Sequence, residues 1–267
     1  MTGPAPAKIN LSLVVGPRRA NGKHELATVY QRVDLGDRIS VGPAAETTVT
    51  GFLGDTIVRT ALDLLGAPHG WQVRIEKHTP VAAGLGGGSS DAATALRLAN
   101  EQLDPRKTAE ELQELAGRVG ADVPFFLHDG PQLGTGDGTV LEALDLPQDF
   151  AVLLLLPKAT SKRSTAEIYA AFDERGGELG YEQRLEALRA ALAGVRRPRD
   201  LAALPPNDLA SSPLAGELLA QGAFRADVSG AGPTVYALFH RTADADAAAR
   251  QVRRFGRVWV TVPAWYG

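Results

Sequence analysis

A glycine-rich loop, Pro80-Val81-Ala82-Ala83-Gly84-Leu85-Gly86-Gly87-Gly88-Ser89-Ser90-Asp91, lies between a predicted strand that ends near Lys77 and a helix predicted over residues 89–103. Glycine lets successive backbone N–H groups point into one concavity, and it lets a ligand approach without meeting a Cβ atom. The start of the following helix adds unpaired N–H donors and partial positive charge. The hydroxyls of Ser89 and Ser90 could cap that helix and also meet a phosphate oxygen or a metal ion. The loop therefore predicts a phosphate-binding site rather than a flexible linker.

Neither of the two common nucleotide-binding motifs fits this loop. A Walker A loop needs a Lys after its last glycine, and this chain has Ser89 in that place. A dinucleotide-binding fingerprint needs an acidic residue about 20 positions later at the end of a strand, whereas the residues near 110 are predicted to be helical. A third kind of nucleotide site is therefore needed.

Outward from the loop, the N-terminal part is rich in predicted strands. Alternation of apolar and polar residues predicts a half-buried strand over residues 8–15, and Asn21-Gly22 predicts a turn after it. Further strands are predicted over residues 26–33 and 38–41, separated by Gly36-Asp37, and over 71–75. A helix is predicted over residues 55–65 with Asp55 as its N-cap.

The C-terminal side of the loop alternates helices with strands. Thr108 and Glu111 form a capping box for a helix over residues 108–119, two short strands flank the turn at residues 134–138, and a buried strand follows over residues 151–156. Helices are then predicted over residues 164–172, 181–192, 207–221 and 243–255, and strands over 226–229, 234–239 and 257–262. This order predicts an α+β protein of two domains, residues 1–147 and 148–267, the second with helices on one face of its sheet.

Composition excludes several classes of function. Lys and Arg number 28 against 31 Asp and Glu, and the two signs are interspersed, which argues against a nucleic-acid partner. The absence of Cys excludes disulfides, thiolate metal sites and a cysteine nucleophile. The most apolar run, residues 151–156, is far shorter than the roughly 20 residues of a membrane span. We therefore expect a cytoplasmic enzyme with no membrane partner.

Three further segments accompany the loop: Pro6-Ala7-Lys8-Ile9-Asn10-Leu11, Gly120-Ala121-Asp122-Val123-Pro124 and Asp227-Val228-Ser229-Gly230-Ala231-Gly232-Pro233-Thr234. Alone, Lys8 would be an ordinary surface residue and Asp122 a helix N-cap. In this order and at these spacings, the four segments resemble the GHMP kinase superfamily from about Pro6 to Leu238. The resemblance implies the two-domain GHMP kinase fold, with a ribosomal-protein-S5-like N-terminal domain and a ferredoxin-like C-terminal domain.

The resemblance also implies a role for each motif. Lys8 and Asp122 would be the catalytic pair, and the loop from Pro80 to Ser90 would wrap the phosphates of ATP. Asp122 would take the proton from the attacking hydroxyl, while Lys8 would keep Asp122 ionised and stabilise negative charge on the reacting oxygens. Mg²⁺ would bridge the phosphates, although the sequence identifies neither its protein ligands nor an oligomeric state.

The acceptor is indicated by residues 18–26, which resemble a cytidine-binding segment within the superfamily. This implies a cytidylated methylerythritol as substrate, phosphorylated on its 2-hydroxyl in the non-mevalonate isoprenoid pathway. His24 would contact the cytosine, Tyr169 would stack on it, and Asn10, on the same strand face as Lys8, could hydrogen-bond the substrate. Lys23 departs from the family pattern, which usually has an aromatic residue immediately before this His.

Three further residues depart from the family pattern. Ala82 and Ala83 stand where relatives often have Gly, which matters only if these positions need positive φ. Asp55 replaces an Asn expected near the adenine.

The sequence leaves alternative functions open. The acceptor could be another alcohol such as homoserine or mevalonate, or the chain could bind a nucleotide without turnover. An RNA-binding module is a further alternative, opposed by the acidic balance.

Overall fold

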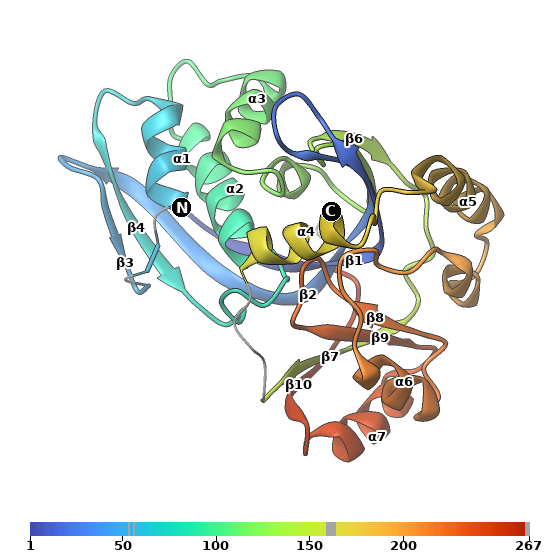
Figure 1. Ribbon diagram of the computed structural model, residues 1–267. Helices are drawn as coiled ribbons and strands as arrows, with labels where there is room; N and C mark the ends of the chain where they lie inside the picture. Colours follow the sequence, from blue (N-terminus) through green and yellow to red (C-terminus); the bar gives the residue numbers. More distant parts are fainter. Residues whose placement is uncertain (53, 56, 159–163, 265–267) are drawn as a thin grey trace.

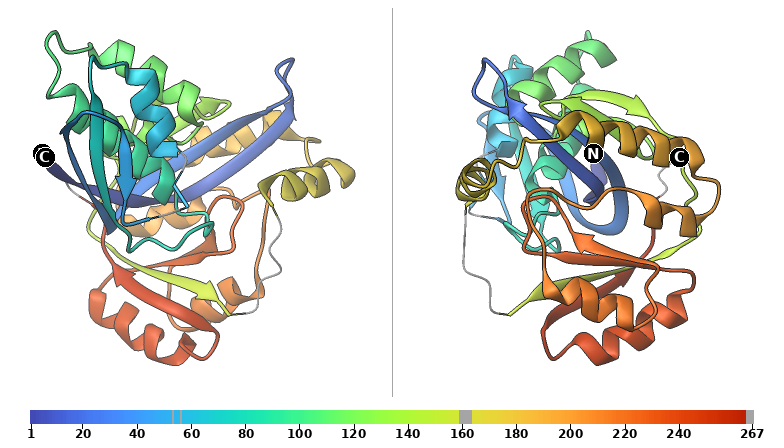
Figure 2. Two further views of the ribbon diagram at one scale, coloured as in Figure 1. Left: turned by 90° about the vertical axis from the view of Figure 1, so that its left-hand side faces the viewer. Right: turned by 45° about the vertical axis from the view of Figure 1, so that its right-hand side comes forward.

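Two β-sheets with helices on their outer faces make up the molecule (Figure 1; Figure 2). The computed structural model describes residues 1–52, 54–55, 57–158 and 164–264. The first sheet has the order β3-β4-β2-β5-β6, with β1 paired to β2. Its strands are β1 (Thr2–Arg18), β2 (His24–Ala44), β3 (Thr48–Thr50), β4 (Gly70–Glu76), β5 (Gln132–Gly136) and β6 (Val140–Ala143).

The helices of the N-terminal half gather on one side of this sheet (Figure 1). They are α1 (Ile57–Leu65), α2 (Gly87–Asn100), α3 (Ala109–Val119) and the short 3-10 helix η1 (Pro124–Leu127). Asp55 accepts a hydrogen bond from the backbone of Val58 at 3.2 Å, and Thr108 and Glu111 form the predicted capping box. The apolar faces of these helices pack with β2 and β4 into one core cluster that contains Trp71 and Phe125.

The prediction of two strands separated by Gly36-Asp37 was wrong, because β2 runs through both. The pairing of β1 with β2 shifts there instead, so that Pro6 pairs with Gly36 and Ala7 with Val33. A Cβ atom on Gly36 would stand 2.6 Å from the carbonyl oxygen of Ala5. Gly36 therefore allows β1 and β2 to approach each other closely, and it does not form a turn.

The predicted alternation of β1 is present, but its polar face is not in solvent. Ile9 and Leu11 point into the core, and on the other face Lys8 is 3% exposed and Asn10 is 4% exposed. The strand is buried on both sides because its polar face lies against the glycine loop and the segment around Ser229. Burial of such a face requires polar partners, and this is the first structural sign of a site.

The second sheet has the order β10-β7-β9-β8, with all neighbours antiparallel. Its strands are β7 (Ala151–Pro157), β8 (Arg225–Val228), β9 (Val235–Phe239) and β10 (Gly256–Thr261). The long connection from β7 to β8 holds α4 (Thr165–Glu174), α5 (Tyr181–Gly194), the 3-10 helix η2 (Pro198–Ala203) and α6 (Pro213–Ala220), and α7 (Thr242–Val252) joins β9 to β10. This is the β-α-β-β-α-β arrangement of the predicted ferredoxin-like fold.

The helix predicted over residues 207–221 begins only at Pro213, with Ser212 as its N-cap. Asn207 has another role, since its Nδ2 donates to the carbonyl oxygens of Val228 and Gly230 at 2.9 and 2.7 Å. Proline is also favoured at the first helical position. The amide of Asn207 thus fixes the glycine segment after β8 in place.

The two sheets share a core that includes Ile9 of β1, Val29 of β2, Leu154 of β7 and Leu238 of β9. The first sheet ends with β6 and the second begins with β7, while the domain division at residue 147 stays a prediction. Within the described ranges, no helix is both long and apolar enough to cross a membrane.

Candidate active site

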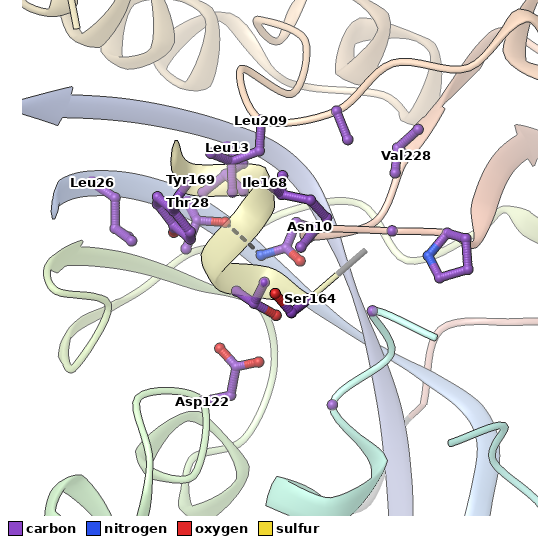
Figure 3. Close-up of a pocket in the computed structure, with 18 of the residues that line it drawn as sticks. Asn10, Leu13, Leu26, Thr28, Asp122, Ser164, Ile168, Tyr169, Leu209 and Val228 are labelled. Carbon is purple, nitrogen blue, oxygen red and sulfur yellow. Dashed lines mark hydrogen bonds between the residues drawn. The ribbon is translucent and has the colours of Figure 1, made fainter. Parts of the chain in front are cut away.

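A cleft of about 1770 Å³ lies where β1, β2, the glycine loop, α4 and the segment after β8 meet (Figure 3). A smaller cavity of about 320 Å³ adjoins it and is lined by Phe52, Asp55, Ile57 and Lys77. Several loop residues line both cavities: Val81, Ala82, Gly84, Gly86 and Ser89. The loop therefore separates a large compartment from a small one, as expected for a site that brings two ligands together.

Lys8 and Asp122 meet in the large cleft. The Nζ atom of Lys8, on β1, stands 3.3 Å from Oδ2 of Asp122, in the turn before η1. The lysine side chain is 4% exposed and the aspartate side chain 30% exposed, so the aspartate faces the open cleft. The backbone N–H of Lys8 donates to the carbonyl oxygen of Leu85 at 2.9 Å, which places the pair beside the glycine loop.

Asn10 is part of the same polar floor. It accepts a hydrogen bond from Lys8 Nζ at 2.6 Å and donates from Nδ2 to Thr28 Oγ1 at 2.7 Å, the dashed line of Figure 3. In that view Asp122 lies below this bond and Tyr169 of α4 above it. Asn10 is therefore positioned by two side chains, and its contact with substrate stays a prediction.

The pairing of β1 with β2 shifts directly after Asn10, beside the cleft. Asn10 pairs with Tyr30 and Ser12 with Val29, which leaves Leu11 as the extra residue of a bulge. The freed carbonyl oxygen of Leu11 accepts hydrogen bonds from Arg225 and from the hydroxyl of Tyr236, both buried. Bulges are frequent beside active sites because they redirect side chains.

Tyr30 is a site residue that the sequence did not reveal. It lies opposite Asn10 on β2, and its hydroxyl donates to Oδ1 of Asp122 at 3.0 Å. Its ring stacks on Phe125 and lies 5.6 Å from Lys8 Nζ. Burial, reinforced by the Asp122 carboxylate, raises the pKa of Tyr30 well above its ordinary value, so the phenol stays a donor. The only sequence signal was its place on a strand face, which no local motif marks.

Tyr30→Phe should lower kcat about five- to tenfold, since a hydrogen bond to Asp122 worth roughly 1–1.5 kcal/mol is removed. The ring keeps its stacking on Phe125, so ATP affinity and melting temperature should change little. Steady-state kinetics and calorimetric ATP binding would measure the two effects separately. Tyr181→Phe, at a tyrosine of α5 outside the cleft lining, is the matched control. An unchanged kcat in Tyr30→Phe would refute the role of this hydroxyl.

The glycine loop has the backbone conformations that its sequence suggested. Gly84 and Gly86 have φ values of 79° and 66°, and a Cβ atom on Gly84 would stand 2.3 Å from the carbonyl oxygen of Ser229. Of the two alanines, Ala82 has a positive φ, 52°, so it is held in a strained conformation that Gly would favour, whereas Ala83 does not have a positive φ. Ser229 Oγ donates to the carbonyl oxygen of Gly84 at 2.9 Å and thereby braces the loop.

The helix after the loop starts earlier than predicted, and its start is open. Gly86, in a left-handed conformation, is the N-cap of α2, and no side chain caps this end. The prediction that Ser89 and Ser90 cap the helix was wrong, because both lie inside its first turn. The buried Oγ of Ser90 has no hydrogen-bond partner. Uncapped N–H groups at a helix start suit an anion such as phosphate, and Ser89 of the same turn lines both cavities.

The opposite end of the cleft holds the two residues predicted to contact the base. His24 and Tyr169 stack on each other, with ring centroids 4.8 Å apart and an angle of 25° between the planes. Phe172 meets the imidazole edge-on at 5.8 Å. Burial raises the pKa of Tyr169 to about 12. The two rings form one aromatic surface of the cleft, and its contact with cytosine stays a prediction.

Two ion pairs border this aromatic surface. Asp173, on the same helix as Tyr169, accepts from His24 Nε2 at 2.7 Å and from Arg18 at 2.5 Å. Burial is the largest single influence and opposes ionisation, but the hydrogen bonds and charges of Arg18 and His24 together outweigh it and lower the pKa of Asp173. Lys23, which departs from the family pattern, pairs through Nζ with Asp137 Oδ2 at 2.7 Å. Arg18 and Lys23 are thus each held beside a carboxylate at this end of the cleft.

The fold and the site together are those of a small-molecule kinase of the GHMP class. The family model described as GHMP kinases N terminal domain matches residues 55–130, and that described as GHMP kinases C terminal matches residues 203–258. A solved 4-(cytidine 5'-diphospho)-2C-methyl-D-erythritol kinase superposes with a TM-score of 0.78 at 34% identity, covering 99% of this chain and 100% of that one. The mevalonate kinase of Methanococcus jannaschii, at 14% identity, 98% coverage of its chain and a TM-score of 0.73, shares the fold.

Relatives in sequence show which family within the GHMP class the chain belongs to. The 4-diphosphocytidyl-2-C-methyl-D-erythritol kinase of Desulfitobacterium hafniense is 37% identical over 96% of this chain and 93% of its own length. The enzyme of that name from Kineococcus radiotolerans is 38% identical over 94% of this chain and 84% of its own length. The chain belongs to the family of 4-diphosphocytidyl-2-C-methyl-D-erythritol kinases.

Proposed function

We propose that the protein transfers the γ-phosphoryl group of ATP to the 2-hydroxyl of 4-diphosphocytidyl-2-C-methyl-D-erythritol, a step of non-mevalonate isoprenoid synthesis. The observation that carries the proposal is the meeting of Lys8 and Asp122 between a glycine loop and an aromatic surface. A phosphate donor suits the loop, and a base suits the aromatic surface. Small molecules are its only proposed partners, with neither nucleic acid nor membrane, and its proposed location is the cytoplasm.

Asp122 is the proposed general base. Lys8 contacts one of its carboxylate oxygens and Tyr30 the other, so its orientation is fixed while lone pairs stay available to the substrate hydroxyl. Lys8 also supplies positive charge where negative charge develops on the reacting oxygens. Most of the remaining rate enhancement would come from holding acceptor and phosphate in line.

The loop fits a nucleotide phosphate with its Mg²⁺ ion. No group of three acidic or His side chains suited to a metal occurs among the residues placed by the structure. Mg²⁺ is often held by few protein ligands together with substrate phosphates and water. Ser89, in the open first turn of α2, lines both cavities, and its hydroxyl is proposed to hold the ion beside the phosphates. The ion would neutralise charge on the phosphates.

The charges at the acceptor end suit a nucleoside diphosphate. Arg18, Lys23 and Arg175 line the cleft near the aromatic surface of His24 and Tyr169. Homoserine and mevalonate, the alternative acceptors, have neither a base nor a diphosphate to use these groups. Structures of homoserine and mevalonate kinases are 13–19% identical to this chain, a level that shows a shared fold alone.

A coupled ADP-release assay with ATP and Mg²⁺ would test the proposal. The acceptors are 4-diphosphocytidyl-2-C-methyl-D-erythritol, homoserine and mevalonate. Turnover with the cytidylated alcohol alone is the expected result. Turnover with another alcohol would keep the kinase mechanism and refute the substrate. No turnover, despite ATP binding, would favour a non-catalytic nucleotide-binding protein.

Tyr169→Ala should raise the KM for the cytidylated acceptor about tenfold or more, because stacking of a base on an aromatic ring is worth roughly 1–3 kcal/mol. The KM for ATP should stay near its wild-type value, since Tyr169 lines the large cleft and not the small cavity. Tyr169→Phe keeps the ring and should keep the acceptor KM. Equal acceptor KM values in Tyr169→Ala and Tyr169→Phe would contradict stacking.

A further inference from the structure

The bulge in β1 changes which side chains of this strand face the cleft. Lys8 and Asn10 lie before the bulge, Leu13 lies after it, and all three line the cleft. Figure 3 shows Asn10 and Leu13 there. Successive side chains of a regular strand point to opposite faces, so positions 8 and 10 would not share a face with position 13. The extra residue, Leu11, brings them onto one face, with polar side chains at one end and an apolar side chain at the other.

The packing of β1 shows the same change of face. Ile9 and Val14 both lie in the core cluster that the two sheets share. Leu13 and Val15 lie in a separate cluster with Phe172 of α4, beside the aromatic surface. Odd-numbered side chains therefore enter the shared core before the bulge, and an even-numbered one does so after it. Because a slip by one residue exchanges the two faces of a strand, the place of the bulge decides which side chains reach the cleft.

Two side chains of the second sheet hold the carbonyl group of the bulged residue. Arg225 Nη2, on β8, donates to the carbonyl oxygen of Leu11 at 2.5 Å, and the hydroxyl of Tyr236, on β9, donates to the same oxygen at 3.0 Å. Arg225 Nε in turn donates to the Tyr236 hydroxyl at 2.9 Å. The two residues are 7% and 0% exposed. Both lone pairs of this carbonyl oxygen are thus used by buried donors.

The guanidinium group is itself fixed by the backbone around it. It donates to three further carbonyl oxygens in and after η2, those of Leu201 at 3.2 Å, Leu204 at 2.7 Å and Pro205 at 3.0 Å. With its bonds to Leu11 and Tyr236, all five of its N–H groups have an acceptor. The Asp227 carboxylate lies 3.8 Å from Nη2 and offsets the buried charge. A planar group bound on every side holds its partners in one orientation.

We propose that Arg225 and Tyr236 are positioning residues of the kinase reaction, because they fix the bulge at Leu11 and thereby hold Lys8 and Asn10 in place. The inference rests on the proposed function, since it assumes that Lys8 belongs to the catalytic pair. Asn10 connects the two parts, because it adjoins Leu11 and accepts a hydrogen bond from Lys8 Nζ at 2.6 Å. Arg225 and Tyr236 do not line the cleft, so they act through β1 and not on a substrate.

Tyr236→Phe tests this inference with the loss of one hydroxyl, since the ring stays in the core. The kcat with ATP, Mg²⁺ and 4-diphosphocytidyl-2-C-methyl-D-erythritol should fall about five- to tenfold, because small misplacements of reacting groups slow a reaction. The acceptor KM and the calorimetric Kd for ATP should each change less than about twofold. Tyr181→Phe, at a tyrosine outside the cleft lining, is the control and should leave all three values unchanged. All assays are run well below the melting temperature of each variant.

A second comparison repeats Tyr236→Phe in the Lys8→Met background. If the hydroxyl acts by placing Lys8, its removal should there lower kcat less than about twofold, while the melting temperature falls equally in both backgrounds. A merely structural role would give the same fold-loss of kcat in both. Arg225→Lys keeps a charge beside Asp227 but lacks the planar fork, so it should show the same dependence on Lys8.

The outcomes separate this inference from the kinase assignment. Equal fold-losses in the two backgrounds, or an unchanged kcat in Tyr236→Phe, would overturn the positioning role although the kinase assignment stands. Absence of turnover in the wild type would refute the proposed function, and the positioning role with it.

Discussion

Asp122→Asn is expected to lower kcat by about 10²–10⁴-fold, the usual contribution of a general base. Asparagine matches aspartate in size, and its amide can still meet Lys8 and Tyr30 in the present geometry. It cannot accept the proton of the substrate hydroxyl. Affinity for ATP should therefore stay near the wild-type value while turnover is lost, as measured by ADP release and by calorimetric ATP binding.

Asp129→Asn is the matched control for this variant. Asp129 lies seven positions further along the chain, and its side chain is 86% exposed with a single contact to Arg32 at 3.5 Å. Arg32 is buried, but it also donates to the carbonyl oxygens of Phe125 and Phe126, and the Asp129 carboxylate is screened by solvent. The kcat and the melting temperature of Asp129→Asn should therefore remain close to wild type. Retention of more than about a tenth of the activity in Asp122→Asn would show that proton removal by Asp122 is not required.

The sequence could predict those features that are encoded within a few consecutive residues. The capping box of Thr108 and Glu111 and the strand-loop-helix order around the glycines follow from local geometry alone, and the structure has both. The serine caps failed for a local reason as well. An N-cap residue needs a conformation outside the helix, and Gly86 takes that place in a left-handed conformation three residues before Ser89.

Residues whose roles depend on partners far along the chain could not be found in this way. Tyr30 reaches Asp122 across 92 positions, and Asp173 reaches His24 across 149. Each is an ordinary residue for its strand or helix, so no local pattern distinguishes it. The pairing register of β1 with β2 and the placement of α4 over the cleft are tertiary properties, and they select these partners.

The polar face of β1 illustrates the same limit. Alternation predicts which side chains share a face, and Lys8 and Asn10 do share one. Alternation cannot say what covers that face, because the contacts come from far along the chain: Leu85 lies 77 positions from Lys8, and Ser229 lies 219 positions from Asn10. A lysine on a half-buried strand is expected to reach solvent, whereas Lys8 is almost wholly enclosed.

Because Lys8 is enclosed beside Asp122, its charge acts at short range on the reacting oxygens. Lys8→Met should therefore lower kcat by about 10²–10³-fold, comparable to the loss of one oxyanion-stabilising donor. Methionine fills much of the same space, and loss of the ion pair costs less than for a wholly buried pair because the Asp122 side chain is 30% exposed and stays solvated. The main structural cost is the unpaired Oδ1 of Asn10, about 1–3 kcal/mol of unfolding free energy. The variant should therefore fold and bind ATP but turn over slowly, as thermal melting, calorimetry and ADP release would record.

A double-variant cycle separates this role from a general loss of packing. If Lys8 and Asp122 act as one unit on the transferred proton and the developing charge, Lys8→Met combined with Asp122→Asn should cost little more than Asp122→Asn alone. Independent roles would instead multiply the two losses. Lys107→Met, at a lysine outside the cleft lining, controls for removal of a positive charge in general. Multiplicative losses would refute the pair as a unit, because each residue would then contribute through separate contacts.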